Sequence, residues 1–247
     1  MKLKAVNNEY YNTLGTDWYE SNNNPIAILR QEQRTKTPLI LEHLKRHFNE
    51  SVDLSMLDIG CGAGFLTNEL SKKYKHIAGL DASASSLEIA KEFDKTKKVK
   101  YILGNAMNLP FEPETFDSVF AMDFLEHVQG PKEVVFQAAN VLKKNGLFFF
   151  HTFNRNPLSW LVIIKFMEWF VPNTPKDLHR LEYFIKPEEL VMMMKETGLE
   201  LIEIKGIRPC FDAEFFRCLF KREVSKEFRF KINDSLTLGY IGVAKKL

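Results

Sequence analysis

Residues 57 to 66 read LDIGCGAGFL, an apolar run that passes into three glycines at every second position. The run from 54 to 60 predicts a short buried strand, and residues 64 to 74 predict an amphipathic helix. Glycines let a backbone turn tightly and approach a ligand closely, and the N-terminus of the following helix attracts negative groups. The stretch therefore predicts a strand, a glycine turn and a helix that together bind a ligand.

An acidic residue ends the next predicted strand. Residues 76 to 81 read HIAGLD, so Asp81 follows the glycine turn by about 20 residues. A carboxylate in this place accepts hydrogen bonds from the ribose hydroxyls of a nucleotide. Strand, glycine turn, helix, strand and acid in this order indicate a nucleotide site much more strongly than the glycines do alone.

Strands and helices continue to alternate along the chain. Further strands are predicted at 99–106, 116–123 and 147–153, and helices at 85–93 and 131–146, with Gly146 as a left-handed cap on the second. After them come a helix at 187–198 and strands at 199–207 and 235–246. This order predicts an α/β fold, a Rossmann-like doubly wound sheet that is mostly parallel and has an antiparallel last strand.

We expect three consecutive regions within one domain. Residues 1–50 form an N-terminal helical cap, whose helix at 26–48 is broken or bent near Pro38. Residues 51–155 form the ligand-binding core. Residues 156–247 supply a lid helix and complete the same domain. Residues 209–234, rich in phenylalanine and charge, receive no prediction.

The bulk composition fits a globular protein. Hydrophobic residues make up 45% of the chain and charged residues 27%, which is ordinary for such proteins. A net charge of +2, without a basic stripe, argues against a nucleic-acid partner. Three cysteines without a C-x-x-C pair, and an N-terminus without the apolar core of a signal peptide, favour a cytoplasmic location.

Three polar side chains follow the strand at 116–123. They are Asp123, Glu126 and His127, in the sequence FAMDFLEHVQG. The carboxyl ends of strands in open α/β sheets are where ligands bind. A metal site, a proton relay and a simple turn after a buried strand are all compatible with this pattern.

The spacing G-x-G-x-G with an acid before it resembles the S-adenosylmethionine motif of class I methyltransferases. The stretch from 104 to 128 also resembles that superfamily from its third strand to past its fourth. The resemblance implies a methyl donor held by residues of both stretches, with the adenine bordered by residues 105–107. These residues are Asp58, Gly60, Gly62, Gly64, Asp81, Asn105, Ala106, Met107 and Met122.

A more specific resemblance begins after the fifth strand. The stretch HTFNRNPLSW, the oily helix after it, and FIKPEEL resemble the ubiquinone-biosynthesis O-methyltransferases, which methylate polyprenyl catechols and phenols. That family carries an arginine near its N-terminus that holds the carboxylate of the donor. Here the matching run is LRQEQRTKTP, so Arg34 is the predicted residue and Arg30 the alternative.

The same resemblance implies roles for the polar residues after the fourth strand. The family has E-x-x-E-H there, implicated in binding a divalent metal, so Asp123, Glu126 and His127 are predicted Mg²⁺ ligands. The alternatives are a general base at His127 without metal, and residues that only shape the pocket. Glu126, His127 and His179 are the predicted catalytic residues.

Residues 158–171 predict an apolar lid helix with two tryptophans. It either packs in a core, or admits a polyprenyl tail at a membrane surface. Membership in a quinone-biosynthesis complex is a further expectation. Two alternative functions stay open: a methyltransferase with another small or lipid-like O or N acceptor, and a non-catalytic protein that binds the donor.

Overall fold

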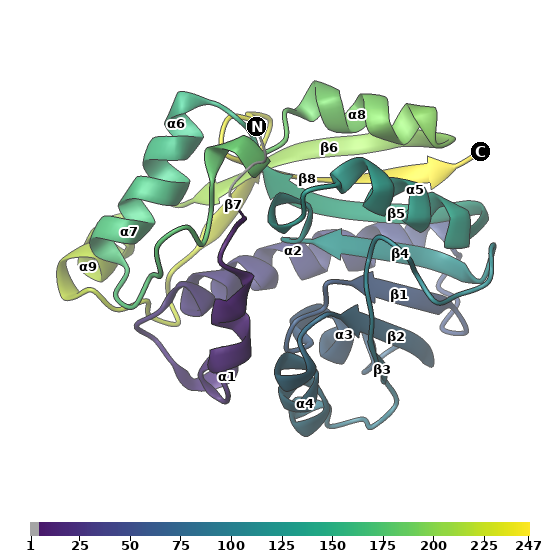
Figure 1. Cartoon of the computed structure of the whole chain (residues 1–247), viewed down its shortest axis with the longest axis horizontal. Coiled ribbons are helices and arrows are strands. Elements are labelled where there is room, and N and C mark those ends of the chain that lie inside the picture. Colours follow the sequence, from purple (N-terminus) through teal and green to yellow (C-terminus); the bar gives the residue numbers. More distant parts are fainter. Residues whose placement is uncertain (1–4) are drawn as a thin grey trace.

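A single twisted sheet forms the centre of the molecule (Figure 1), which is a computed structural model that describes residues 5–247. Its eight strands run in the order β3-β2-β1-β4-β5-β8-β6-β7. Strands β1 to β5 are parallel to one another, and β8 pairs antiparallel with both β5 and β6. The strands are β1 Ser55–Ile59, β2 His76–Asp81, β3 Lys100–Leu103, β4 Phe116–Met122, β5 Leu142–Phe153, β6 Leu199–Pro209, β7 Phe230–Asn233 and β8 Gly239–Lys246.

Helices cover both faces of this sheet. Side chains of β4 alternate between them, because successive residues of a strand point to opposite sides. Val119 and Ala121 pack in one core with α5 and α8, and Phe120 and Met122 pack in the other with α2 and α3. The helices are α1 Asp17–Glu20, α2 Pro25–His47, α3 Phe65–Leu70, α4 Ala84–Phe93, α5 Pro131–Val141, α6 Pro157–Ser159, α7 Phe166–Phe170, α8 Pro187–Glu196 and α9 Ala213–Lys221.

This architecture confirms the predicted fold class, including the antiparallel last strand β8. Two local predictions need correction. Helix α2 is continuous through Pro38, so it is not broken there, and the alternative of a bend stays a prediction. Helix α5 ends at Val141, and the residue with positive φ is Asn145 rather than Gly146. Gly146 serves close strand packing instead, since an added Cβ would lie 3.0 Å from the carbonyl oxygen of Asp117.

The segment without a prediction forms α9 and the edge strand β7. The apolar lid begins with α6, continues as a π-helix over Trp160–Lys165 and ends with α7. Helices α6, α7 and α9 lie at the same end of the molecule, beyond the edge of the sheet that carries β7 (Figure 1). The division into regions at residues 50 and 155 stays a prediction.

Candidate active site

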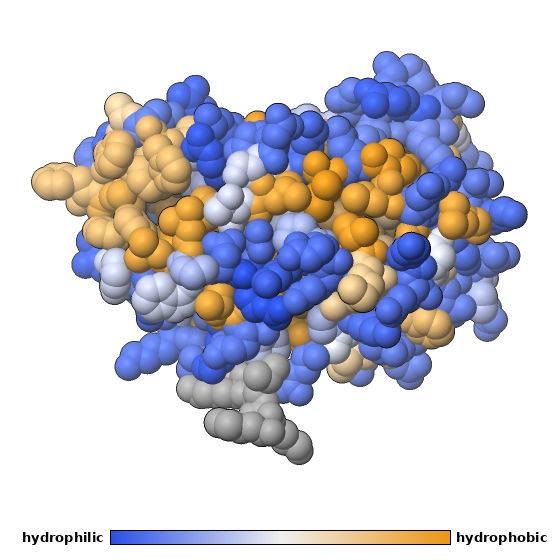
Figure 2. Space-filling view, turned by 90° about the horizontal axis from the view of Figure 1, so that it is seen from above, coloured by the Kyte–Doolittle hydropathy of each residue, from blue (hydrophilic) through white to orange (hydrophobic). Residues whose placement is uncertain are grey.

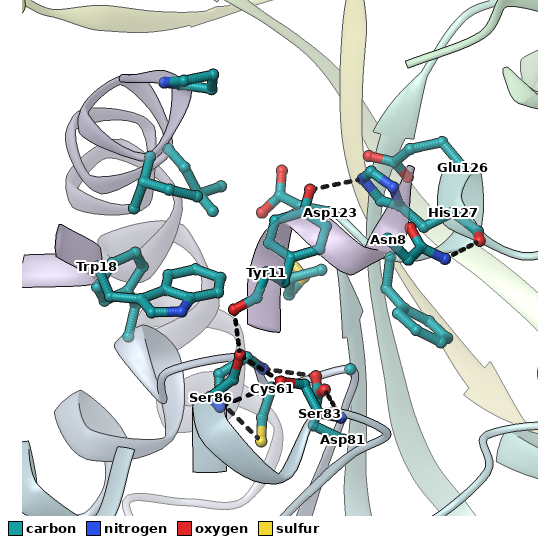
Figure 3. A pocket seen from close by; sticks show the side chains of 18 of the residues that line it. Asn8, Tyr11, Trp18, Cys61, Asp81, Ser83, Ser86, Asp123, Glu126 and His127 are labelled. Atoms are coloured by element: carbon teal, nitrogen blue, oxygen red, sulfur yellow. Dashed lines mark hydrogen bonds between the residues drawn. The ribbon is translucent and has the colours of Figure 1, made fainter. Parts of the chain in front are cut away.

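A pocket of about 400 Å³ opens at the carboxyl ends of β1, β2 and β4. The glycine turn after β1, the end of β2 and the turn after β4 supply one side of it. Helix α2, residues 8–18 and the segment after α7 supply the other (Figure 3). The topology of the sheet places the three turns of the first side together, because parallel strands end at one edge of the sheet.

The glycine turn is held in a conformation that only glycine adopts easily. Gly60 has φ of 71°, and a Cβ there would lie 2.1 Å from the ring of Phe124. Gly62 has φ of 51°, and its N–H donates to Asp81 Oδ2 at 2.8 Å. The Ser83 N–H donates to Asp81 Oδ1 at 2.8 Å, so backbone groups fix both oxygens of this carboxylate.

The N-terminal segment closes the pocket over the glycine turn, which the sequence reasoning did not foresee. The Trp18 ring lies against Gly62 and stacks on Tyr11, with ring centroids 5.6 Å apart. The Tyr11 hydroxyl lies 3.3 Å from His127 Nε2, and the Asn8 side chain donates to the His127 carbonyl oxygen (Figure 3). The aromatic residues before the SNNNP turn were the available signal.

Asp123 directly follows β4 and has a left-handed conformation, with φ of 54°. Its Oδ2 accepts a hydrogen bond from the fully buried Lys36 ammonium, and its Oδ1 lies 2.6 Å from His151 Nδ1. Burial raises the pKa of Asp123, but Lys36 and His151 outweigh burial and hold it well below its ordinary value. Asp123 is therefore an ionised carboxylate whose two oxygens both face cationic or imidazole groups.

Glu126 and His127 lie in one turn of 3-10 helix, Leu125–His127, directly after Asp123. Burial, and then the negative charge of Asp123, raise the pKa of Glu126 to about 7. Its Oε2 accepts a hydrogen bond from Thr152 at 2.8 Å, and its Oε1 is buried without a partner. Glu126 lines the pocket, so this unpaired carboxylate oxygen can take a proton from a ligand bound beside it.

Two neutral imidazoles stand beside Glu126. Burial lowers the pKa of His127 to about 4 and that of His179 to about 3. Their ring centroids are 5.2 Å apart, and both side chains line the pocket. Neither ring carries a positive charge near neutral pH, so each can accept or donate one hydrogen bond to a ligand.

The lining of the pocket is acidic. Among the described residues that line it, none is lysine or arginine, whereas six carry carboxylates: Glu9, Glu32, Asp58, Asp81, Asp123 and Glu126. Burial, and then Asp81 and Asp123, raise the pKa of Asp58 well above its ordinary value. A cationic ligand relieves this accumulation of negative charge, and a sulfonium with an ammonium group suits it.

Nine of the residues predicted from the sequence line this pocket. They are Asp58, Gly60, Gly62, Asp81, Met122, Asp123, Glu126, His127 and His179. The other five do not line it. Arg34 donates instead to the carbonyl oxygen of Lys226, Met107 is 40% exposed, and Asn105 accepts from the Met107 N–H. Gly64, with φ of 80°, begins α3, and Ala106 is buried beside the core of the sheet.

The expected metal ligands do not converge. Among the described residues, the cluster of three whose ligand atoms all lie within 4.8 Å of one another is Glu32, Asp123 and His151, not the predicted trio. The Lys36 ammonium already contacts two members of this cluster. A divalent cation beside an ammonium is repelled, so these residues do not fit the metal as they stand.

Known proteins resemble this chain in sequence and in fold. A methyltransferase domain family matches residues 57–150. A magnesium protoporphyrin IX methyltransferase from Synechocystis, solved with bound S-adenosylhomocysteine, superposes with a TM-score of 0.66 at 16% identity and 97% coverage of each chain. A methyltransferase structure from Bacillus halodurans superposes with a TM-score of 0.61 at 19% identity, over 83% of this chain and 98% of the other. The fold and the glycine-turn pocket thus define a class I methyltransferase that uses S-adenosylmethionine.

Curated relatives identify the family of methyltransferases to which the chain belongs. The ubiquinone biosynthesis O-methyltransferase of Hydrogenovibrio crunogenus is 32% identical over 94% of this chain and 89% of its own length. That of Photobacterium profundum is 34% identical over 69% of this chain and 74% of its own length. The chain belongs to the ubiquinone biosynthesis O-methyltransferase family.

Proposed function

We propose that this enzyme transfers a methyl group from S-adenosylmethionine to a phenolic oxygen of a polyprenyl phenol or catechol in ubiquinone biosynthesis. The family relationship supports the reaction class. The observation that carries the chemistry is the Oε1 atom of Glu126, which is buried without a partner on a residue that lines the same pocket as the glycine turn. It gives the acceptor hydroxyl a proton acceptor beside the donor.

The reaction needs an oxygen nucleophile in line with an already activated methyl group. A phenol has a pKa of about 10, so near neutral pH it is protonated and a poor nucleophile. Glu126 takes the hydroxyl proton, the oxygen forms a bond to the methyl carbon, and the carbon–sulfur bond breaks with its electrons left on sulfur. His127 and His179, both neutral, orient the acceptor by hydrogen bonds.

The donor occupies the glycine-turn side of the pocket in this proposal. Gly60 and Gly62 let the donor approach the backbone closely. Asp81 accepts hydrogen bonds from its ribose hydroxyls, and Asp58 faces its ammonium group. Met122 approaches it from the end of β4. Asn105, Ala106 and Met107 remain predicted adenine neighbours, and Arg34 the predicted partner of its carboxylate, although the pocket described above does not include them.

Magnesium is not part of this mechanism. The sequence predicted it at Asp123, Glu126 and His127, but Asp123 is already paired with an ammonium group. Proton removal is therefore assigned to Glu126 and not to a bound metal ion.

A membrane surface is the expected source of a polyprenyl acceptor. No helix within the described residues is long and apolar enough to cross a bilayer. Apolar side chains do gather on the surface at the end of the molecule that holds α6, α7 and α9 (Figure 2). We call this the outer apolar surface, and its exposed members are Leu158, Trp160, Trp169, Phe211, Phe216 and Phe220. We propose that a cytoplasmic enzyme rests on the bilayer through it, with a place in a quinone-biosynthesis complex.

A direct methylation assay tests the proposal. Purified enzyme, S-adenosylmethionine and a short-chain demethylubiquinol should yield the O-methyl product, detected by mass spectrometry. The same assay with a histamine-like amine and with a fatty acid tests other acceptors. Donor binding by calorimetry together with methylation of only another acceptor would refute the phenolic assignment.

A further inference from the structure

A fully buried ammonium group lies just behind the wall of the pocket. The Lys36 side chain is 0% exposed, although lysine almost always reaches water. Its Nζ contacts Asp123 Oδ2 and lies 3.4 Å from Glu32 Oε2. Two carboxylates face this ammonium group from different sides, and opposite charges at such short range favour its protonated form. Lys36 is thus charged and paired on two sides.

The groups around this ammonium form a set that binds cations. The ligand atoms of Glu32, Asp123 and His151 lie within 4.8 Å of one another. His151 is fully buried, and its Nε2 lies 3.5 Å from Glu32 Oε1 without a hydrogen bond to any protein group. Two carboxylate oxygens and an imidazole nitrogen are ordinary ligands for Mn²⁺ and its neighbours. Without a cation among them, the two carboxylates would repel each other.

We propose that Lys36 is the resident cation of this cluster, that it fixes Asp123 at the pocket wall, and that its charge excludes a divalent metal. Methyl transfer by this enzyme then proceeds without added metal. Lys36 does not line the pocket itself, so it is a positioning residue that acts through Asp123. The activity part of this inference rests on the proposed function, but the exclusion of metal does not.

The unmodified enzyme gives the first test. Its turnover should change less than about twofold between excess chelator and millimolar Mg²⁺, and calorimetry with Mn²⁺ should show no bound ion at the cluster. A requirement for Mg²⁺, or a stoichiometric Mn²⁺ ion in the unmodified protein, would overturn the proposal. The Mn²⁺ titration needs no acceptor, so it remains decisive even if the phenolic assignment fails.

Charge removal gives the second test. Lys36→Met keeps the unbranched side chain as far as the ε position but removes the ammonium group, so Glu32, Asp123 and His151 lose their cation. This variant should bind one Mn²⁺ ion and lose about 100-fold in turnover in chelator, because Asp123 shifts. Millimolar Mg²⁺ or Mn²⁺ should restore part of the loss.

Two further variants separate charge from packing. Lys36→Arg retains the charge and should stay independent of metal. Lys45→Met removes a 59% exposed lysine of the same helix, paired with Glu50, and should change neither property. A Lys36→Met protein with a native near-UV spectrum that binds no Mn²⁺ would contradict the inference. An equal loss of S-adenosylmethionine affinity in the Met and Arg variants would also contradict it, since it would make Lys36 a donor-binding residue.

Discussion

The carboxyl groups of Asp123 and Glu126, three residues apart, have pKa values shifted in opposite directions. Asp123 has a lowered pKa because Lys36 and His151 face it, whereas burial raises the pKa of Glu126 to about 7. Neighbouring titratable groups whose environments separate their pKa values in this way commonly divide the roles of acid, base and fixed charge. In the proposed mechanism, Asp123 is the fixed charge and Glu126 is the group that changes its protonation state.

The pH dependence of catalysis follows from this difference. A base must be deprotonated to act, so turnover should rise with pH and level off above about pH 7, the pKa of Glu126. Glu126→Gln should lower turnover by roughly 10²- to 10⁴-fold. Donor affinity, measured by calorimetry, should stay within about threefold, because the loss concerns the proton-transfer step.

Glu133→Gln on α5 is the matched control, since this exposed glutamate accepts a bond only from Gln137. Its pH profile should match that of the unmodified enzyme. An unchanged profile in Glu126→Gln would remove the assignment of the base.

The same residue should limit stability. The pKa of Glu126 is higher in the folded protein than its ordinary value of 4.5, so folding favours the protonated form. Its contribution to stability is fully present below pH 4.5 and is lost as the pH rises through about 7. Glu126→Gln should therefore raise the free energy of unfolding at pH 8 by up to about 3 kcal/mol. Urea titrations at pH 8 and pH 4.5 check this, and an equal effect at both values would contradict it.

At the scale of single residues, the sequence predicted only part of the site. Glu126 and His127 could be predicted. The turn after the fourth strand lies at the edge of the sheet where ligands bind, and this does not depend on how the other helices pack. Lys36 could not, because its neighbours in RQEQRTKTP are polar and resemble an exposed helix face. Its burial depends on how α2 crosses the ends of β4 and β5, which no local pattern encodes.

At the scale of elements, residues 7–24 act as a cover over the donor half of the pocket. Arg30 on α2 holds this cover, since it donates to the carbonyl oxygens of Asp17, Trp18 and Ser21. Arg34, one turn later, instead reaches the carbonyl oxygen of Lys226. The two arginines of the predicted run therefore have different structural roles.

Removing each arginine distinguishes these roles. Arg30→Ala should loosen the cover, raise the dissociation constant of S-adenosylmethionine by about tenfold and speed hydrogen exchange in residues 8–20, because charge-assisted bonds of about 1.5–3 kcal/mol each are lost. Arg34→Ala should leave donor affinity nearly unchanged, because Arg34 contacts the carbonyl oxygen of Lys226 and does not line the pocket. A larger loss in Arg34→Ala would support the sequence prediction that it holds the donor carboxylate.

Helix α9 shows an element that the sequence did encode but that was not recognised. Phe215, Phe216, Leu219 and Phe220 repeat at helical spacing, and Asp212 caps the helix by accepting from the Phe215 N–H. Phe215 and Cys218 face a small inner core, while Phe220 is 92% exposed. The charged residues between the aromatics obscured this pattern.

Strands β1, β2, β4 and β5 of the parallel part of the sheet were easier to predict than this helix or the edge strand β7. Their apolar runs are continuous because helices bury both faces of a parallel sheet.

At the scale of the whole molecule, the outer apolar surface and the mouth of the pocket are joined through the lid. Met167 of α7 lines the pocket, while Trp169 of the same helix is 54% exposed. One short helix thus contacts both the acceptor site and the outside. A tail that emerges from the pocket would meet this surface first.

The surface predicts binding to lipid vesicles. The enzyme should co-sediment with vesicles of phosphatidylethanolamine and phosphatidylglycerol, and Phe216→Ser with Phe220→Ser should weaken this binding by at least about tenfold, because two exposed aromatic rings lose their apolar contact. Activity on a short-chain acceptor in solution should persist.

Phe136→Ser is the matched control for this experiment. Phe136 is 51% exposed on α5, a helix that contributes no residue to the outer apolar surface. If Phe136→Ser weakens vesicle binding as much as the double variant does, the outer apolar surface is not the part of the enzyme that contacts the membrane.

The acidic lining of the pocket has a consequence for how the catalytic cycle is completed. In the proposed reaction the sulfur of the donor loses its positive charge, while the proton of the acceptor passes to Glu126, one of six carboxylate residues that line the pocket. Methyl transfer therefore moves a positive charge across the pocket and leaves the total charge there unchanged. The enzyme regains its starting state only when this proton leaves Glu126 for solvent, so each turnover ends with the release of a proton as well as of the two products.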